Sequence, residues 1–113
     1  MTPELRIDVA HPPRPAEAVE EALVEAVNEV RNSPDLRVIK VIHGYGSKGK
    51  GGTTKEVVRN WAFVHRTRLT DVITGEEHSL THLPSLKMRS AVGQYPDSDL
   101  TSHNPGITIL WVK

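Results

Sequence analysis

Residues 43–52 form the part of the sequence best suited to chemistry, because this stretch holds five glycines and two lysines. Glycines let backbone N–H groups converge and approach a ligand closely. An apolar run precedes the stretch and a helical pattern follows it, so the unpaired N–H groups at the helix start would also point towards a ligand. Together with the charges of Lys48 and Lys50, this arrangement predicts a phosphate-binding loop.

Three known phosphate-binding motifs match the loop in part. Gly44, Gly46 and Gly49 fit the dinucleotide fingerprint G-x-G-x-x-G, but the chain has too few elements for two mononucleotide-binding halves. The loop also begins like a Walker A motif, yet Gly51 stands where a Ser or Thr should hold magnesium. Residues 46–49 match the loop of KH domains, which joins two helices, whereas here a strand precedes it. A flexible connector with solvated lysines is the simplest alternative.

Basic residues are concentrated around this loop, although the whole chain has 14 basic and 14 acidic residues. Residues 40–68 carry a net charge of +6, whereas residues 1–39 and 69–113 carry −4 and −2. A basic stripe beside a phosphate-binding loop is typical of surfaces that bind a polyanion, so we expect nucleic acid as the partner. The alternative is a solvated helix face. The residues expected to contact phosphate are Gly44, Tyr45, Gly46, Ser47, Lys48, Gly49, Lys50, Lys55 and Arg59.

The length and composition are those of one globular domain. The 113 residues include no cysteine, which excludes disulfides, iron–sulfur ligation and thiol nucleophiles. No apolar run approaches the roughly 20 residues of a membrane-spanning helix, so no membrane partner is expected. The first residues also lack the apolar stretch of a secretory signal, which predicts a cytoplasmic protein.

Hydrophobic spacing predicts the elements that would hold the loop. Alternating or continuous apolar residues indicate strands at residues 5–9, 36–42, 69–74 and 107–112. Helical spacing indicates helices at residues 16–32 and 54–65, the second beginning at a capping box formed by Thr53 and Glu56. Residues 76–106 contain three prolines and no sustained period, so we expect an irregular insertion with room for one short helix.

The order β-α-β-α-β-β predicts an α/β domain, a two-layer sandwich with a mixed four-stranded sheet and helices packed on it. The helices that join the first three strands favour parallel pairing among these strands. Because the carboxyl ends of parallel strands meet at one edge, Asp8, His11 and His43 would face the glycine loop. A carboxylate beside a histidine suits proton transfer in phosphodiester cleavage. The alternative for both histidines is a purely local role in a loop.

Residues 38–46, V-I-K-V-I-H-G-Y-G, followed by a basic helix, resemble the second signature of Smr (small MutS-related) domains, H-G-x-G-x-G. Residues 7–11, I-D-V-A-H, occupy the place of the family's first signature, L-D-L-H-G, and residues 106–112 resemble its last strand. The resemblance implies a single Smr-like domain over residues 1–113 that binds nucleic acid and that, as in some members, nicks DNA or cleaves RNA. It implies functional roles for Asp8, His43, Gly44 and Gly46.

Two positions depart from the family signatures. Ala10 replaces the histidine of the first signature, with His11 one place later, and Lys48 replaces the third glycine of the second, with Gly49 one place later. The first departure bears on nuclease chemistry more than on binding. Three functions therefore stay open: an endonuclease that uses Asp8, His11 and His43 with or without a divalent metal, a non-catalytic nucleic-acid-binding module, and an enzyme acting on a small phosphate compound or nucleotide.

Overall fold

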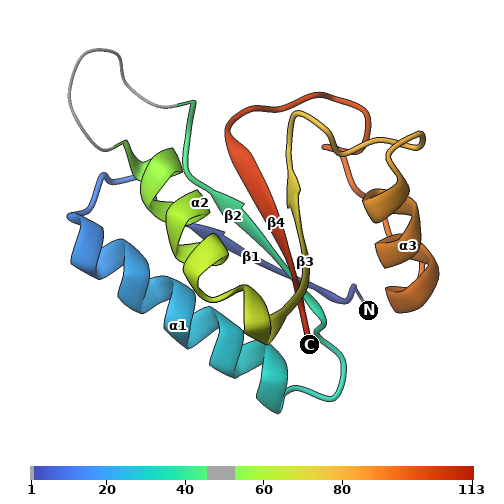
Figure 1. Cartoon of the computed structure of the whole chain (residues 1–113), viewed down its shortest axis with the longest axis horizontal. Coiled ribbons are helices and arrows are strands. Elements are labelled where there is room, and N and C mark those ends of the chain that lie inside the picture. The colour runs from blue at the N-terminus through green and yellow to red at the C-terminus, as the bar shows by residue number, and fades with distance from the viewer. Residues whose placement is uncertain (1, 46–52) are drawn as a thin grey trace.

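The computed structural model describes residues 2–45 and 53–113, which form a mixed four-stranded sheet and three helices (Figure 1). The predicted α/β class is therefore confirmed, and the strands and helices lie close to their predicted ranges. None of the helices in the described part of the chain is long and apolar enough to cross a membrane. In chain order the elements are β1 (Glu4–Asp8), α1 (Ala16–Asn32), β2 (Val38–Ile42), α2 (Thr54–Val64), the short 3-10 helix η1 (Arg66–Arg68), β3 (Leu69–Thr74), α3 (Leu83–Val92) and β4 (Ile107–Val112).

The strand order is β1-β2-β4-β3, which corrects part of the predicted pairing. β1 and β2 pair in parallel as expected, but β4 lies between β2 and β3 and is antiparallel to both. β3 therefore runs parallel to β2 without touching it. Burial explains this order: five of the six residues of β4 and four of the five residues of β2 are buried, so these strands take the interior of the sheet.

Helices α1 and α2 cover one face of the sheet side by side (Figure 1). Leu23 and Val27 of α1 and Trp61 of α2 pack there against Ile39 of β2 and Leu110 of β4. The predicted capping box opens α2, because the hydroxyl of Thr53 accepts a hydrogen bond of 3.1 Å from the backbone N–H of Glu56. These two helices form the expected second layer.

The opposite face of the sheet is covered in part by α3, which lies within the segment left unassigned by sequence spacing. Met88 of α3 packs there against Val38, Ile73 and Ile109. The helix was hard to predict because its apolar residues form no regular stripe, and Ser85 is buried beside Met88. The insertion therefore contributes a third layer that shields apolar residues on the second face of the sheet.

A buried lysine ties this third layer to the sheet. Lys40 lies in the middle of β2 and only 1% of it is exposed. Its Nζ lies 2.7 Å from Asp97 Oδ1, 2.8 Å from Asp99 Oδ2 and 3.7 Å from Glu4 Oε2. Desolvation opposes the charge on Lys40, but the hydrogen bonds to Asp97 and Asp99 outweigh it and raise the pKa of the lysine. The lysine is therefore a charged, fully paired anchor between β2 and the segment that precedes β4.

The same network continues from Asp97 into α3. Asp97 Oδ2 accepts a hydrogen bond of 2.8 Å from His78 Nε2, and His78 Nδ1 lies 2.9 Å from the hydroxyl of Ser85. His78 and Ser85 are fully buried. Burial raises the pKa of Asp97, but the hydrogen bonds from His78 and Lys40 outweigh burial and hold this pKa far below its ordinary value. The network fixes residues 76–106 as a structured part of the domain.

Candidate nucleic-acid interface

One edge of the sheet brings together the ends of β1, β2 and β3 and the start of β4 (Figure 1). The backbone N–H groups of His43 and Gly44 both donate to the carbonyl of Gly106, at 2.9 and 3.1 Å. Gly44 has a φ of +79°, a left-handed conformation that strains any residue with a Cβ. A glycine is therefore required where the chain leaves β2 and enters the predicted phosphate-binding loop.

Asp8 and His11 form an exposed pair at the end of β1. Asp8 Oδ1 accepts hydrogen bonds from the backbone N–H groups of Ala10 and His11, at 2.9 and 3.0 Å, and His11 Nδ1 lies 3.0 Å from Asp8 Oδ2. Desolvation opposes the ionisation of Asp8, but these hydrogen bonds outweigh it and hold the pKa of Asp8 below its ordinary value. The side chains are 38% and 72% exposed, and His11 Nε2 has no hydrogen bond to any described residue.

His43 lies at the same edge, but its ring is enclosed. Only 2% of the residue is exposed. Its Nδ1–H donates to the carbonyl of Gly44 at 2.7 Å, and its Nε2 accepts from the hydroxyl of Thr108 at 2.8 Å. Burial lowers the pKa of His43. The hydrogen bond to the Gly44 carbonyl opposes this shift, and the nearby charges of Arg59 and Lys55 add to it. In this position the imidazole holds the start of the loop against β4, which is a positioning role.

Lys55 and Arg59 lie together on α2, as their spacing predicts, and both contact one carboxylate. Glu76, just after β3, accepts from Lys55 Nζ at 3.0 Å and from both terminal nitrogens of Arg59, at 2.6 and 3.2 Å. The hydrogen bond from Arg59 lowers the pKa of Glu76 to about 2. Desolvation opposes this shift, and the hydrogen bond from Lys55 adds to it. Arg59 Nε also donates to Thr108, so the basic helix is joined to His43 through one hydroxyl.

Glu76→Gln is expected to strengthen nucleic-acid binding by about threefold, because it releases part of the charge of Lys55 and Arg59 for phosphate contacts. One added phosphate contact on duplex DNA steepens the slope of log K against log salt by about 0.9. The measurement is fluorescence anisotropy over a salt series. Glu77→Gln is the matched control, because it changes the net charge equally while Glu77 contacts Thr74 and His82 instead. Equal effects of the two substitutions would contradict the prediction.

The remaining predicted contacts lie on the loop itself. Tyr45 is 72% exposed, and the edge of its ring approaches Gly106: a Cβ at this glycine would lie 3.4 Å from Tyr45 Cε1. The predicted contacts of Gly46, Ser47, Lys48, Gly49 and Lys50 lie outside the described residues.

Three residues of this edge did not stand out in the sequence: Arg6, Glu76 and Thr108. The alternation of side chains along β1 places Arg6 on the same face as Asp8, so the sequence pattern alone could have pointed to Arg6. Thr108 is the one polar residue within an otherwise apolar strand and is fully buried, which is a typical sign of a required hydrogen bond. Glu76 has no such signal, because its contact with α2 exists only in the folded chain.

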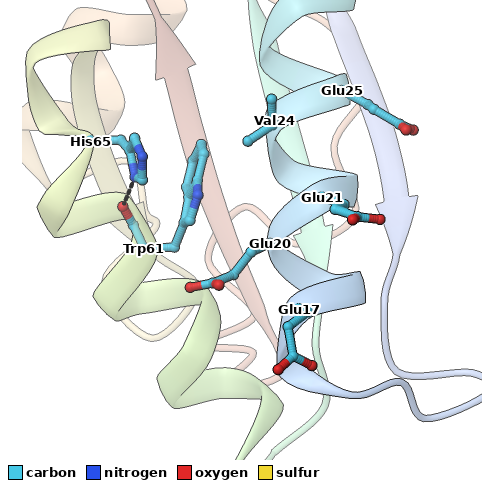
Figure 2. A pocket seen from close by; sticks show the side chains of 7 residues that line it. All are labelled: Glu17, Glu20, Glu21, Val24, Glu25, Trp61 and His65. Carbon is cyan, nitrogen blue, oxygen red and sulfur yellow. Dashed lines mark hydrogen bonds between the residues drawn. The ribbon is translucent and has the colours of Figure 1, made fainter.

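A second surface has the opposite charge. A groove of about 560 Å³ lies between α1 and α2, where Glu20 and Val24 project towards Trp61 and His65 (Figure 2). The rings of Trp61 and His65 stack with centroids 4.2 Å apart. The other residues that line the groove are Glu17, Glu21 and Glu25. Because four carboxylates repel phosphate, this groove does not belong to a nucleic-acid interface.

No group of three or more His, Asp or Glu side chains within residues 2–45 and 53–113 is arranged to hold a metal ion. The fold and the edge residues together define a mixed α/β domain with an exposed Asp–His pair at the end of β1 and two basic side chains, Lys55 and Arg59, on α2. The chain matches no protein-family model, no curated protein and no solved structure. The resemblance to Smr domains therefore remains a hypothesis from the motifs.

Proposed function

We propose that this chain is an Smr-like nucleic-acid-binding domain that cleaves phosphodiester bonds with Asp8 and His11. The observation that carries the proposal is the exposed, hydrogen-bonded pair of these two side chains, with Asp8 Oδ2 3.0 Å from His11 Nδ1. His11 stands one place after the histidine position of the family's first signature, yet it reaches the aspartate of that signature. The displaced histidine therefore keeps the carboxylate contact that such chemistry needs.

In the proposed reaction His11 acts as the general base and Asp8 orients it. The Nδ1–H of His11 donates to Asp8, which leaves Nε2 to take a proton from an attacking water. The oxygen of this water bonds to phosphorus, the P–O bond to the leaving sugar oxygen breaks, and the leaving oxygen takes a proton from solvent. His43 is assigned to positioning the loop, since both of its ring nitrogens have partners inside the protein.

Charge supports binding at the same edge. Lys55 and Arg59 both form salt bridges to one carboxylate, that of Glu76, so the three side chains together carry a net positive charge. The predicted loop lysines precede the same helix in the sequence. The acidic groove between α1 and α2 disfavours indiscriminate attachment elsewhere, so we expect a modest affinity that depends strongly on salt.

The experiment measures binding of single-stranded, duplex and branched DNA and of RNA over a salt series, with nicking assayed on the same substrates. The proposal expects log K to fall linearly with log salt, with a slope steeper than about −2, and cleavage of at least one substrate. A flat salt dependence would exclude a nucleic-acid partner. Salt-dependent binding without cleavage of any substrate would exclude the nuclease and support the alternative of a non-catalytic nucleic-acid-binding module. The burial of His43 favours this alternative.

A further inference from the structure

A cavity of about 230 Å³ lies at the same edge of the sheet, on the face opposite α1 and α2. Pockets for whole drug-sized ligands measure roughly 300–1,000 Å³, so this cavity suits one smaller unit. It is separate from the predicted contacts of Lys55 and Arg59. Its lining includes Arg6, His11, Lys40, Tyr45, Asn104 and Gly106.

The floor of the cavity is a set of polar groups that satisfy one another. Asn104 Nδ2 donates to Asp99 Oδ1 at 2.9 Å, and Asn104 Oδ1 accepts from the backbone N–H of Gly106 at 2.9 Å. Asp99 in turn pairs with the buried Lys40. Because these groups are already paired, the floor is rigid, and recognition of a ligand depends on the side chains at the mouth.

Tyr45 supplies an aromatic surface at this mouth. The side chain is largely exposed, and Gly106 lets one edge of the ring approach the backbone closely. The rest of the ring faces solvent beside the cavity. An exposed aromatic ring is a platform on which an unpaired base can stack, whatever the sequence of the nucleic acid.

Arg6 supplies a cation beside the Asp8–His11 pair. Its side chain is 62% exposed, and it lies 3.7 Å from a carboxylate oxygen of the largely buried Glu4 side chain, a distance too long for a hydrogen bond. A guanidinium can bind a phosphate through two parallel hydrogen bonds. Arg6 and Asp8 lie two residues apart on one face of β1, so a phosphate on Arg6 would lie near His11.

We propose that this cavity is a subsite for one unpaired nucleotide, whose base stacks on Tyr45 and whose phosphate is held by Arg6 beside His11. The proposal rests on the proposed nucleic-acid function and names its substrate: a single strand, or a strand with one base turned out of the helix. Bases inside a duplex are stacked on their neighbours and cannot offer a face to Tyr45. The cavity thus discriminates between paired and unpaired strands.

The test compares a 12-nucleotide single strand, the same sequence as a duplex, and free AMP and UMP, each bound to the full chain. Tyr45→Ala should weaken single-strand binding by about 5- to 150-fold, which corresponds to about 1–3 kcal/mol of stacking, and change duplex binding less than about twofold. Tyr45→Phe keeps the ring and should bind as the parent does. Arg6→Gln should make the single-strand salt slope shallower by about 0.7.

Arg31→Gln is the matched charge control, because Arg31 is exposed in the last turn of α1 and does not line this cavity. If the parent binds strands in a salt-dependent way but Tyr45→Ala leaves single-strand binding within twofold, the subsite is wrong and the proposed function stands. An equal loss on the duplex would also overturn the subsite. Binding of AMP or UMP as tight as that of the 12-mer would overturn the strand as its substrate. A parent that binds neither strand form would overturn both proposals.

Discussion

Lys40→Met is expected to lower the free energy of unfolding by about 3–5 kcal/mol at pH 7. The substitution keeps most of the side-chain volume but removes the ammonium group from three buried or partly buried carboxylates, those of Glu4, Asp97 and Asp99. A buried charge that loses its partner costs far more than an exposed one. Urea denaturation followed by circular dichroism measures the effect.

The pH dependence separates this cause from a simple packing defect. Hydrogen bonds overcome desolvation and lower the pKa values of Asp97 and Asp99, so the parent loses stability as the pH falls through and below about 4, where unfolded aspartates take up protons. Without Lys40, protonation of the same carboxylates relieves repulsion in the folded state. The stability difference between parent and variant should therefore shrink as the pH falls from 7 to about 4.

Lys87→Met is the matched control, because it makes the same chemical change on the exposed side of α3. Its expected effect is within about 0.5 kcal/mol. Adding Asp97→Asn to Lys40→Met should recover part of the loss, since one buried negative charge is removed. A Lys40→Met chain as stable as the parent at pH 7 would show that the lysine contributes no net stability.

The second large effect concerns cleavage: His11→Gln is expected to slow nicking by about 10²- to 10⁴-fold. The glutamine side chain can still donate a hydrogen bond to Asp8, but it cannot take a proton from water. Binding should stay within about threefold, because the substitution leaves Lys55, Arg59 and the loop unchanged. Single-turnover cleavage of a labelled substrate at saturating protein measures the chemical step alone.

His65→Gln is the control for this experiment, because the imidazole of His65 stacks on Trp61 in the acidic groove, away from the proposed interface. Its cleavage rate should match that of the parent. Asp8→Asn should give an intermediate loss, since the amide oxygen can still accept hydrogen bonds while the charge that orients His11 is gone. If His11→Gln cleaves as fast as the parent, His11 is not the general base and another residue must have that role.

Much of the fold could be predicted because local patterns determine it. The helical spacing of Val19, Leu23 and Val27 marks the buried side of α1, and Thr53 with Glu56 marks the start of α2. The strand pairing could not be predicted in full, because the place of β4 depends on how much apolar surface each strand buries. α3 was left open because its buried residues, Ser85 and Met88, form no apolar stripe.

The roles of the predicted site residues depend in part on tertiary contacts, which the spacing of residues along the sequence does not show. The sequence grouped Asp8, His11 and His43 as one reactive set, whereas the fold exposes the first two and encloses His43 between Gly44 and Thr108. It also grouped Lys55 and Arg59 as phosphate contacts, and the turn after β3 brings the carboxylate of Glu76 onto both. The roles of these residues depend on contacts between segments that are distant in the sequence. The periodicity of apolar residues and the residue types therefore do not reveal them.

The sequence by itself determined the α/β class, the two long helices, and the concentration of positive charge in residues 40–68 within a neutral chain. These follow from the chain's local order of residues, which sets periodicity and charge directly. The tertiary structure alone decided the place of β4 in the sheet, the partners of Lys40 and the exposure of His11. The physical reason is that desolvation and ion pairing depend on which distant segments meet, and only the folded chain brings these segments together.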